Sequence, residues 1–251
     1  MKNKTGIFLC IVLIISFTTP TIITVLAKRP DQTPPPLEKI VFIHHKKGHV
    51  KPPGVGKPNG DSGEYKLLGK GVKWKAETIS LYIDSSNSGL TQSFVEEAVR
   101  IAAEEWDDGA CSDWGGVEIN LVDEYHTMSD ATFDEDSPDG KNEILFGWEE
   151  PGTIAVTIIW GYFGGPPKTR EIIEFDILFN TYYAWGDAET EENVMDLQNI
   201  ATHEIGHGLG LADLYDTDAA EETMYGYADY GEMNKRSLYK GDIAGITALY
   251  G

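Results

Sequence analysis

Cysteine is scarce in this chain, which has two in 251 residues. Cys10 lies in an apolar N-terminal stretch, so removal of that stretch as an export signal would leave Cys111 alone. A single cysteine excludes a disulfide within the mature chain. Stability must then come from the hydrophobic core, from bound metals or from charge networks. We interpret Cys111 as a small buried residue and not as a nucleophile.

Basic side chains are also few, with 20 Lys and Arg against 41 Asp and Glu and a net charge of -21. This balance argues against nucleic acid as a partner. The positive charge is concentrated in residues 28–75, which hold 11 basic and 4 acidic side chains, whereas residues 76–251 hold 7 and 37. Two interpretations stay open: a solvated basic tail beside an acidic surface, and a basic tail that docks on the acidic domain.

The N-terminal residues 1–27 have the pattern of an export signal, with a basic start, an apolar run and small residues before position 28. We predict a signal peptide here, and therefore a secreted, extracellular protein. The alternative is an uncleaved membrane anchor, because the apolar stretch could nearly span a bilayer. In that case the protein would be attached to the cell surface.

Residues 28–68 are rich in Pro, Gly and Lys, a composition that is typical of a linker or pro-segment. This segment contains His44, His45 and His49, which either capture a metal or remain solvated. We expect the folded domain to cover residues 69–251.

Periodicity within residues 69–251 predicts an α+β domain. Its twisted mixed sheet should pack on one central helix and on two further helices. An acidic loop is expected at residues 123–140. We expect a helix at residues 90–108 with Thr91 as its N-cap. The remaining expected elements are strands at 78–84, 117–122, 144–148, 152–163 and 172–179, and helices at 191–208 and 241–249.

The central helix ends in a metal-binding pattern at residues 202–213. His203 and His207 stand four residues apart, so both imidazoles project from one helix face and can bind Zn²⁺. Glu204 is placed where a general base for a metal-activated water would stand. Gly210 can end the helix with a positive φ, and Asp213 would then arrive as a third ligand. Three protein ligands and an open fourth position are typical of a catalytic zinc site.

Several further segments accompany this motif, and together they resemble the metzincin metallopeptidases and, within them, the matrixin-type family. These segments are residues 222–227 with Met224, Trp74 before the first expected strand, residues 176–180 followed by Trp185, and the C-terminal residues 242–251. The resemblance covers most of residues 74–251.

The resemblance implies a secreted zinc endopeptidase that hydrolyses peptide bonds of protein or peptide substrates. It implies that His203, His207 and Asp213 bind Zn²⁺ and that Glu204 acts as general base. It also implies that Met224 forms a hydrophobic floor below the metal and that residues 226–227 wall the substrate pocket. A strand such as residues 152–160 would be the sheet edge along which an extended substrate lies. We expect a monomer.

The chain departs from the matrixin pattern in three places. Asp213 stands where animal matrixins have His, and Gly226 stands where Pro follows the Met-Tyr pair. No cysteine other than Cys10 precedes the domain, so the thiolate latch of animal matrixin pro-segments is absent. If the basic tail inhibits the enzyme, it must act through charge, bulk or one of its histidines.

Three alternatives remain open at the level of sequence. A non-catalytic, zinc-containing acidic binding module at the cell surface would also carry such a motif. A different zincin layout would use Glu221 or Glu222 as the third ligand. The acidic loop at residues 123–140 either binds Ca²⁺ or is solvated. The spacing of its acidic residues matches no defined calcium-binding loop, so no ligands are assigned.

Overall fold

The structure is a computed structural model that describes residues 35–48, 64–107 and 119–251. The predicted signal or anchor at residues 1–27 lies outside these ranges, as do His49 and Cys111. Within the ranges, no helix is long and apolar enough to cross a membrane.

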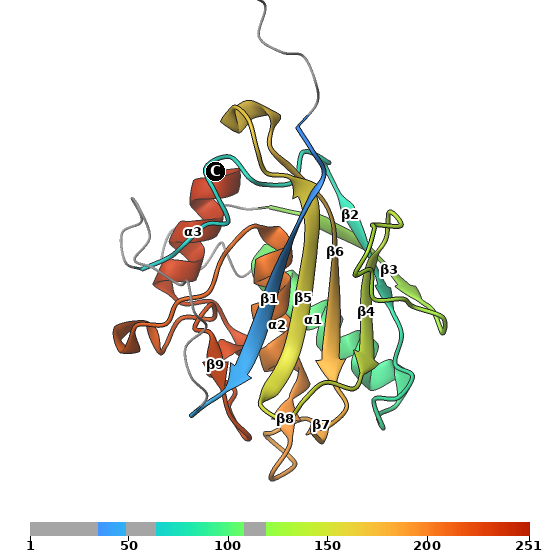
Figure 1. Cartoon of the computed structure of the whole chain (residues 1–251). Coiled ribbons are helices and arrows are strands. Elements are labelled where there is room, and N and C mark those ends of the chain that lie inside the picture. The colour runs from blue at the N-terminus through green and yellow to red at the C-terminus, as the bar shows by residue number, and fades with distance from the viewer. Residues whose placement is uncertain (1–34, 49–63, 108–118) are drawn as a thin grey trace, which may run out of the picture. The chain divides into compact units, whose positions relative to one another are not determined.

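A mixed sheet forms one layer of the domain, and seven of the strands found in the described residues belong to it (Figure 1). The order across the sheet is β3-β2-β4-β6-β5-β1-β9. The four strands β3, β2, β4 and β6 run parallel, and β5 runs antiparallel to β6. The strands are β1 (Glu38–Lys46), β2 (Ile79–Ile83), β3 (Val122–Thr127), β4 (Asn142–Gly147), β5 (Thr153–Tyr162), β6 (Glu171–Asn180) and β9 (Tyr227–Ala228). Two short strands, β7 (Trp185–Gly186) and β8 (Met195–Asp196), pair separately.

Helices α1 and α2 pack against each other and form the second layer behind the sheet (Figure 1). Helix α2 lies against β5 and β6, and its residues are almost all buried. Trp106 of α1 joins the two helices by donating its indole N–H to the carbonyl oxygen of Thr202 at 2.7 Å. The helices are α1 (Gln92–Asp107), α2 (Leu197–Leu209) and α3 (Lys240–Tyr250), with short 3-10 turns at Pro167–Thr169, Thr217–Ala219 and Asn234–Arg236. The expected α+β class, with a mixed sheet packed on the motif helix, is confirmed.

Most expected elements agree with the structure within two residues, and two differ by more. Of the strand expected at residues 117–122, residues 119–121 are not in a strand, and β3 lies at Val122–Thr127, mostly within the expected acidic loop. It is an edge strand paired only with β2, and such a strand tolerates exposed charged side chains. Helix α2 begins at Leu197 and not near residue 191, because Asn193 has a φ of 61° and the Asp196 carboxylate caps the helix by accepting the N–H of Asn199 at 2.9 Å.

The segment expected as a linker or pro-segment contains a nine-residue strand, β1. Its backbone pairs antiparallel with β5, for example at Val41 opposite Ile158, and parallel with β9 at His45 opposite Tyr227. The β-branched and aromatic residues 40–43 are typical of a strand, but the Pro-rich stretches on both sides favoured a linker. The domain bounds proposed from composition remain a prediction.

Glycine at position 210 ends α2 and reverses the chain, as the sequence predicts. Its φ is 114°, and its N–H bonds to the carbonyl oxygens of Gly206 and His207. A Cβ at this position would lie 3.0 Å from the Val72 carbonyl oxygen and 3.1 Å from Leu249. The turn therefore depends on glycine for both conformation and space.

We predict that Gly210→Ala lowers the free energy of unfolding by about 1–3 kcal/mol, because alanine is strained at positive φ. Urea denaturation monitored by circular dichroism measures this change. Gly164→Ala is the control, since Gly164 lacks positive φ and its nearest contact is 3.8 Å away. Equal midpoints for the two variants would contradict the assignment.

Candidate metal centre

His203 and His207 lie on one face of α2, and both side chains are fully buried. The Nδ1 atom of His203 donates to the carbonyl oxygen of Thr223 at 2.7 Å, and Nδ1 of His207 donates to that of Leu211 at 3.0 Å. A carbonyl oxygen only accepts, so the proton of each neutral ring is on Nδ1. Both Nε2 atoms therefore carry a lone pair and are oriented as metal ligands.

Asp213 completes a group of three ligand atoms after the turn at Gly210. Its Oδ1 atom lies 3.3 Å from Nε2 of His203 and 3.3 Å from Nε2 of His207. All three atoms are buried and make no hydrogen bond. Ligands about 2.0–2.1 Å from a shared tetrahedral ion stand roughly 3.3 Å apart, so this spacing fits a zinc ion. A cation would also satisfy polar atoms that are otherwise costly to bury.

The protonation of His203 and Asp213 favours metal binding, whereas the Asp213 carboxylate outweighs burial and raises the pKa of His207. Burial lowers the pKa of His203 to about 4, so its ring is neutral near pH 7. Burial alone would raise the pKa of Asp213, but the adjacent His207 and His203 hold it well below its usual range. A neutral imidazole and an ionised carboxylate are the forms that coordinate metals.

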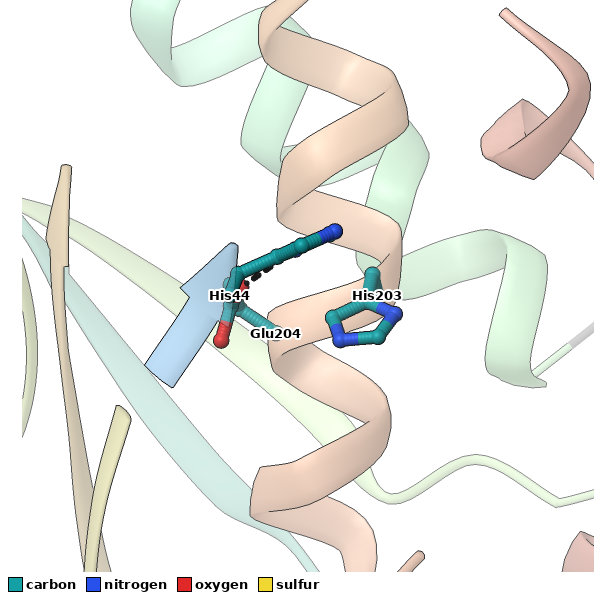
Figure 2. Close-up of side chains that lie close together, drawn as sticks. All are labelled: His44, His203 and Glu204. Atoms are coloured by element: carbon teal, nitrogen blue, oxygen red, sulfur yellow. Dashed lines mark hydrogen bonds and ion pairs between the residues drawn. The ribbon is translucent and has the colours of Figure 1, made fainter. Parts of the chain in front are cut away.

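Glu204 reaches from α2 to side chains of the sheet, and its carboxylate lies in a second group of potential ligand atoms with His44 and His203. Its Oε2 atom accepts a hydrogen bond from the Thr157 hydroxyl of β5 at 2.6 Å. Its Oε1 atom is 2.9 Å from Nδ1 of His44 on β1 (Figure 2). Burial raises the pKa of the Glu204 carboxyl group. A carboxyl group whose pKa is raised toward neutrality is suited to take up and return a proton.

Tyr215 lies beside Asp213 and orients its carboxylate. Its hydroxyl donates to Oδ2 of Asp213 at 2.8 Å, which leaves Oδ1 for the two histidines. At Gly226 a Cβ atom would lie 2.7 Å from the Tyr215 ring and 3.0 Å from Oδ1 of Asp213. A proline at Gly226 would therefore collide with both, which explains this departure from the matrixin pattern.

The buried carboxylate of Asp242 fixes the segment that contacts the His203 ligand. Asp242 at the start of α3 accepts the N–H of Thr223 at 2.6 Å and the N–H of Met224 at 3.0 Å. Thr223 in turn holds His203, and Met224 is buried against Gly206 of α2. The three residues link α3 to the histidine ligands.

The two glutamates considered as alternative ligands lie elsewhere. The Glu222 carboxylate accepts the N–H groups of Gly241 and Asp242 at 2.9 and 3.1 Å, at the start of α3. Glu221 is exposed. Neither belongs to a group of clustered potential ligands in the described residues, whereas Asp213 does.

A second group of acidic side chains lies between the loop after β3 and the strands β4 and β6. Asp134 clusters with Glu143 and Asp176, and also with Asp139 and Glu174. The Oε1 atoms of Glu143 and Glu174 and Oδ2 of Asp134 are buried without hydrogen-bond partners. Burial, partly offset by backbone hydrogen bonds, raises the pKa of Asp176 to about 8 and that of Glu174 to about 7.

Sequence reasoning missed Thr157 and Tyr215, and it named His44 without finding the residue that His44 contacts. Thr157 lies in an expected strand. Its neighbours in the sequence are apolar, and this pattern does not indicate that the Thr157 hydroxyl contacts Glu204. Tyr215 follows Asp213 by two residues, a spacing that could have suggested its role. The contact of His44 with Glu204 joins positions 160 residues apart, which no local pattern reveals.

The matrixin family model matches residues 73–251, so the chain belongs to the matrixin family. The matched range contains the centre described above and excludes β1. The family uses zinc, in agreement with the histidine-rich group of ligand atoms.

Individual relatives agree with this family. Human neutrophil collagenase is 28% identical over 203 residues, which cover 80% of this chain and 38% of that protein. Human matrix metalloproteinase-20 is also 28% identical over 203 residues, with coverages of 80% and 37%. Rat matrilysin is 26% identical over 202 residues, with coverages of 80% and 67%. The chain thus spans less than two fifths of the length of the first two relatives.

We predict that Tyr215→Phe weakens zinc binding about 10–100-fold, because loss of a hydrogen bond that orients a ligand commonly has this effect. Competition with a chromogenic chelator measures the affinity. Tyr182→Phe, at an exposed tyrosine, is the control. Equal affinities of the two variants would show that Tyr215 does not orient Asp213.

Proposed function

We propose that this chain is a zinc-dependent endopeptidase in which His203, His207 and Asp213 bind the metal and Glu204 is the general base. The observation that carries the proposal is the convergence of three buried, unpartnered ligand atoms beside a buried glutamate. Membership of the matrixin family supports it. Protein or peptide chains are the proposed substrates.

The proposed mechanism assigns a step to each group. When bound, zinc polarises the peptide carbonyl and acidifies a water molecule. Glu204 takes the proton from that water and passes it to the leaving amine. The Thr157 hydroxyl fixes one carboxylate oxygen, and the other, which His44 contacts in this structure, is the proposed proton acceptor. The expected sheet edge at residues 152–160 is not an edge in the structure, because β5 pairs with both β6 and β1. Its backbone groups would hold an extended substrate by β-augmentation only where β1 is displaced.

The second candidate is a non-catalytic acidic binding module that keeps zinc for structure. The net charge of -21 favours it as a surface-binding domain. Glu204 disfavours it, because a structural zinc site needs no additional buried carboxyl group that two further side chains hold in place.

We also propose that the protein is secreted and acts as a monomer. The basic and apolar pattern of residues 1–27 supports export. The excess of acidic side chains supports solubility and opposes binding of nucleic acid. An uncleaved N-terminal segment would instead place the same domain at the cell surface.

A calcium ion is the proposed occupant of the acidic group around Asp134, Glu174 and Asp176. Calcium prefers six to eight oxygen ligands, and its charge would stabilise carboxylates that burial otherwise disfavours. The buried oxygen atoms without hydrogen-bond partners support this site.

Glu204→Gln should retain zinc and lower kcat by at least about 10²–10⁴-fold, the usual contribution of a general base. Cleavage of a fluorogenic peptide library and metal analysis of the same samples measure both quantities. Glu221→Gln, at an exposed position, is the matched control and should behave as the unmodified chain. Near-normal cleavage by Glu204→Gln would rule out this role. Retention of zinc without cleavage, both by the unmodified chain and by chains freed of the N-terminal tail, would favour the binding module.

Stability should depend on pH and calcium together. Without calcium, the raised pKa values mean that the folded state binds protons more tightly than the unfolded state, so stability falls as pH rises from about 4 to about 8. Calcium should remove this fall. We predict a higher Tm at pH 8 when Ca²⁺ is added to the zinc-loaded protein, measured by scanning calorimetry.

The variant Glu174→Gln/Asp176→Asn provides the control for the calcium site. Amides do not titrate, so its Tm should vary less with pH and should not respond to Ca²⁺. A calcium response equal to that of the unmodified chain would place the ion elsewhere.

A further inference from the structure

Lys235 carries a positive charge in the interior of the domain. Its side chain is fully buried, although an ammonium group is costly to remove from water. The ammonium donates to the carbonyl oxygen of Tyr227 in β9 at 2.8 Å. That oxygen is its one hydrogen-bond acceptor among the described residues, and an ammonium has three N–H donors. The remaining donors can therefore bind an anionic group of a ligand.

Glu232 does not fully neutralise this charge. Its Oε2 atom is 3.9 Å from the Lys235 Nζ atom, outside hydrogen-bond distance, and has no hydrogen-bond partner in the described ranges. Its other oxygen pairs with Lys47. Burial lowers the pKa of Lys235 to about 8, and the carboxylates of Glu232, Asp242 and Asp213 offset burial only in part. Lys235 is thus mostly charged near pH 7 without a close carboxylate partner.

Asn199 adds a second buried donor next to Lys235. It lies on α2, one helical turn before the proposed ligand His203. Its Oδ1 atom accepts the backbone N–H of Lys235 at 2.7 Å. Its Nδ2 atom is buried and has no hydrogen-bond partner in the part of the chain that the structure describes. An unpaired amide group in the interior is costly, and an acceptor oxygen of a ligand would satisfy it.

The position of His44 indicates which part of a bound peptide could reach this charge. His44 lies on β1, which pairs with β5 as an extended peptide would. Its ring lies over His203 with centroids 3.9 Å apart, and its Nδ1 atom is 2.9 Å from Oε1 of Glu204 (Figure 2). Burial and the charge of Lys235 both lower the pKa of His44, so the ammonium is within electrostatic reach of this ring. A peptide side chain at the same place would lie beside His203 and within reach of Lys235.

We propose that Lys235 and Asn199 form a carboxylate-binding site that selects substrates with an acidic side chain next to the cleaved peptide bond. The inference rests on the proposed peptidase function. The carboxylate would accept charge-assisted hydrogen bonds from the ammonium and a further bond from the amide. Repulsion by Glu204 would direct it toward Lys235. An uncharged side chain would leave the buried cation unpaired, so it would bind less tightly.

A double-mutant cycle in the full chain tests the pairing without any peptide. His44→Glu places a carboxylate where the ring lies, and His44→Gln places an uncharged group of the same size there. Each is combined with Lys235→Met. We expect the Tm of His44→Glu, relative to that of His44→Gln, to fall by at least about 4 °C when Lys235→Met is added. Repulsion by Glu204 is present in both backgrounds and cancels.

Lys240→Met is the matched control for this cycle, because Lys240 is exposed. It should change the Tm difference between the two His44 variants by less than about 1 °C. A Tm difference that is the same with and without Lys235→Met would overturn the carboxylate site.

Peptide cleavage tests the selectivity. Paired fluorogenic peptides carry Glu or Gln in turn at each position beside the cleaved bond. We expect kcat/KM at one position to favour Glu by at least about 10-fold in the full chain and in Lys240→Met, and by less than about twofold in Lys235→Met. The ratio of two kcat/KM values does not depend on how often β1 is displaced, because both peptides meet the same enzyme.

The two measurements separate the carboxylate site from the peptidase function. Coupling in the cycle without cleavage of any peptide would support the site and refute the peptidase proposal. Equal cleavage of the Glu and Gln peptides at every position would overturn the selectivity and leave the peptidase proposal intact. If Lys235→Met does not fold, the full chain is compared at about pH 7 and about pH 9. The preference for Glu should then fall as the Lys235 ammonium, whose pKa is about 8, loses its proton, and a constant ratio would overturn the proposal.

Discussion

The structure depends on one constraint: three ligand atoms of His203, His207 and Asp213 converge in the interior without hydrogen-bond partners. Buried polar atoms of this kind are costly unless a cation satisfies them. Their positions are set by the helix, by the turn at Gly210 and by two backbone carbonyl groups that hold the histidine rings. The carboxylate at the start of α3 then fixes the segment that supplies one of those carbonyl groups.

Strand β5 contacts the proposed general base and also pairs with β1. Strand β5 supplies the Thr157 hydroxyl to Glu204 and the backbone groups for an extended peptide. Strand β1 already pairs with those backbone groups, and its His44 contacts the same glutamate. An extended substrate could therefore pair with β5 only where β1 is displaced.

The sequence was sufficient for the α+β class, the motif helix and its glycine end, because these follow from local periodicity and a short motif. It was insufficient for β1, since the partners of that strand lie more than 100 residues away and its Pro- and Lys-rich surroundings indicate a linker. Strand β3 lies further along the chain than expected. Its polar residues are typical of a loop, but a strand at a sheet edge tolerates them. The pairing of Tyr215 with Gly226 depends on shape complementarity, which spacing alone does not encode.

Zinc content of purified variants tests the central claim most directly. The account predicts about one tightly bound zinc in the full chain, its loss in Asp213→Ala, and its retention in Glu221→Ala. Asp213→Ala contains a cavity and loses one hydrogen-bond acceptor for Tyr215, so circular dichroism must first show that it is folded. Full zinc content in a folded Asp213→Ala variant would contradict the three-ligand centre.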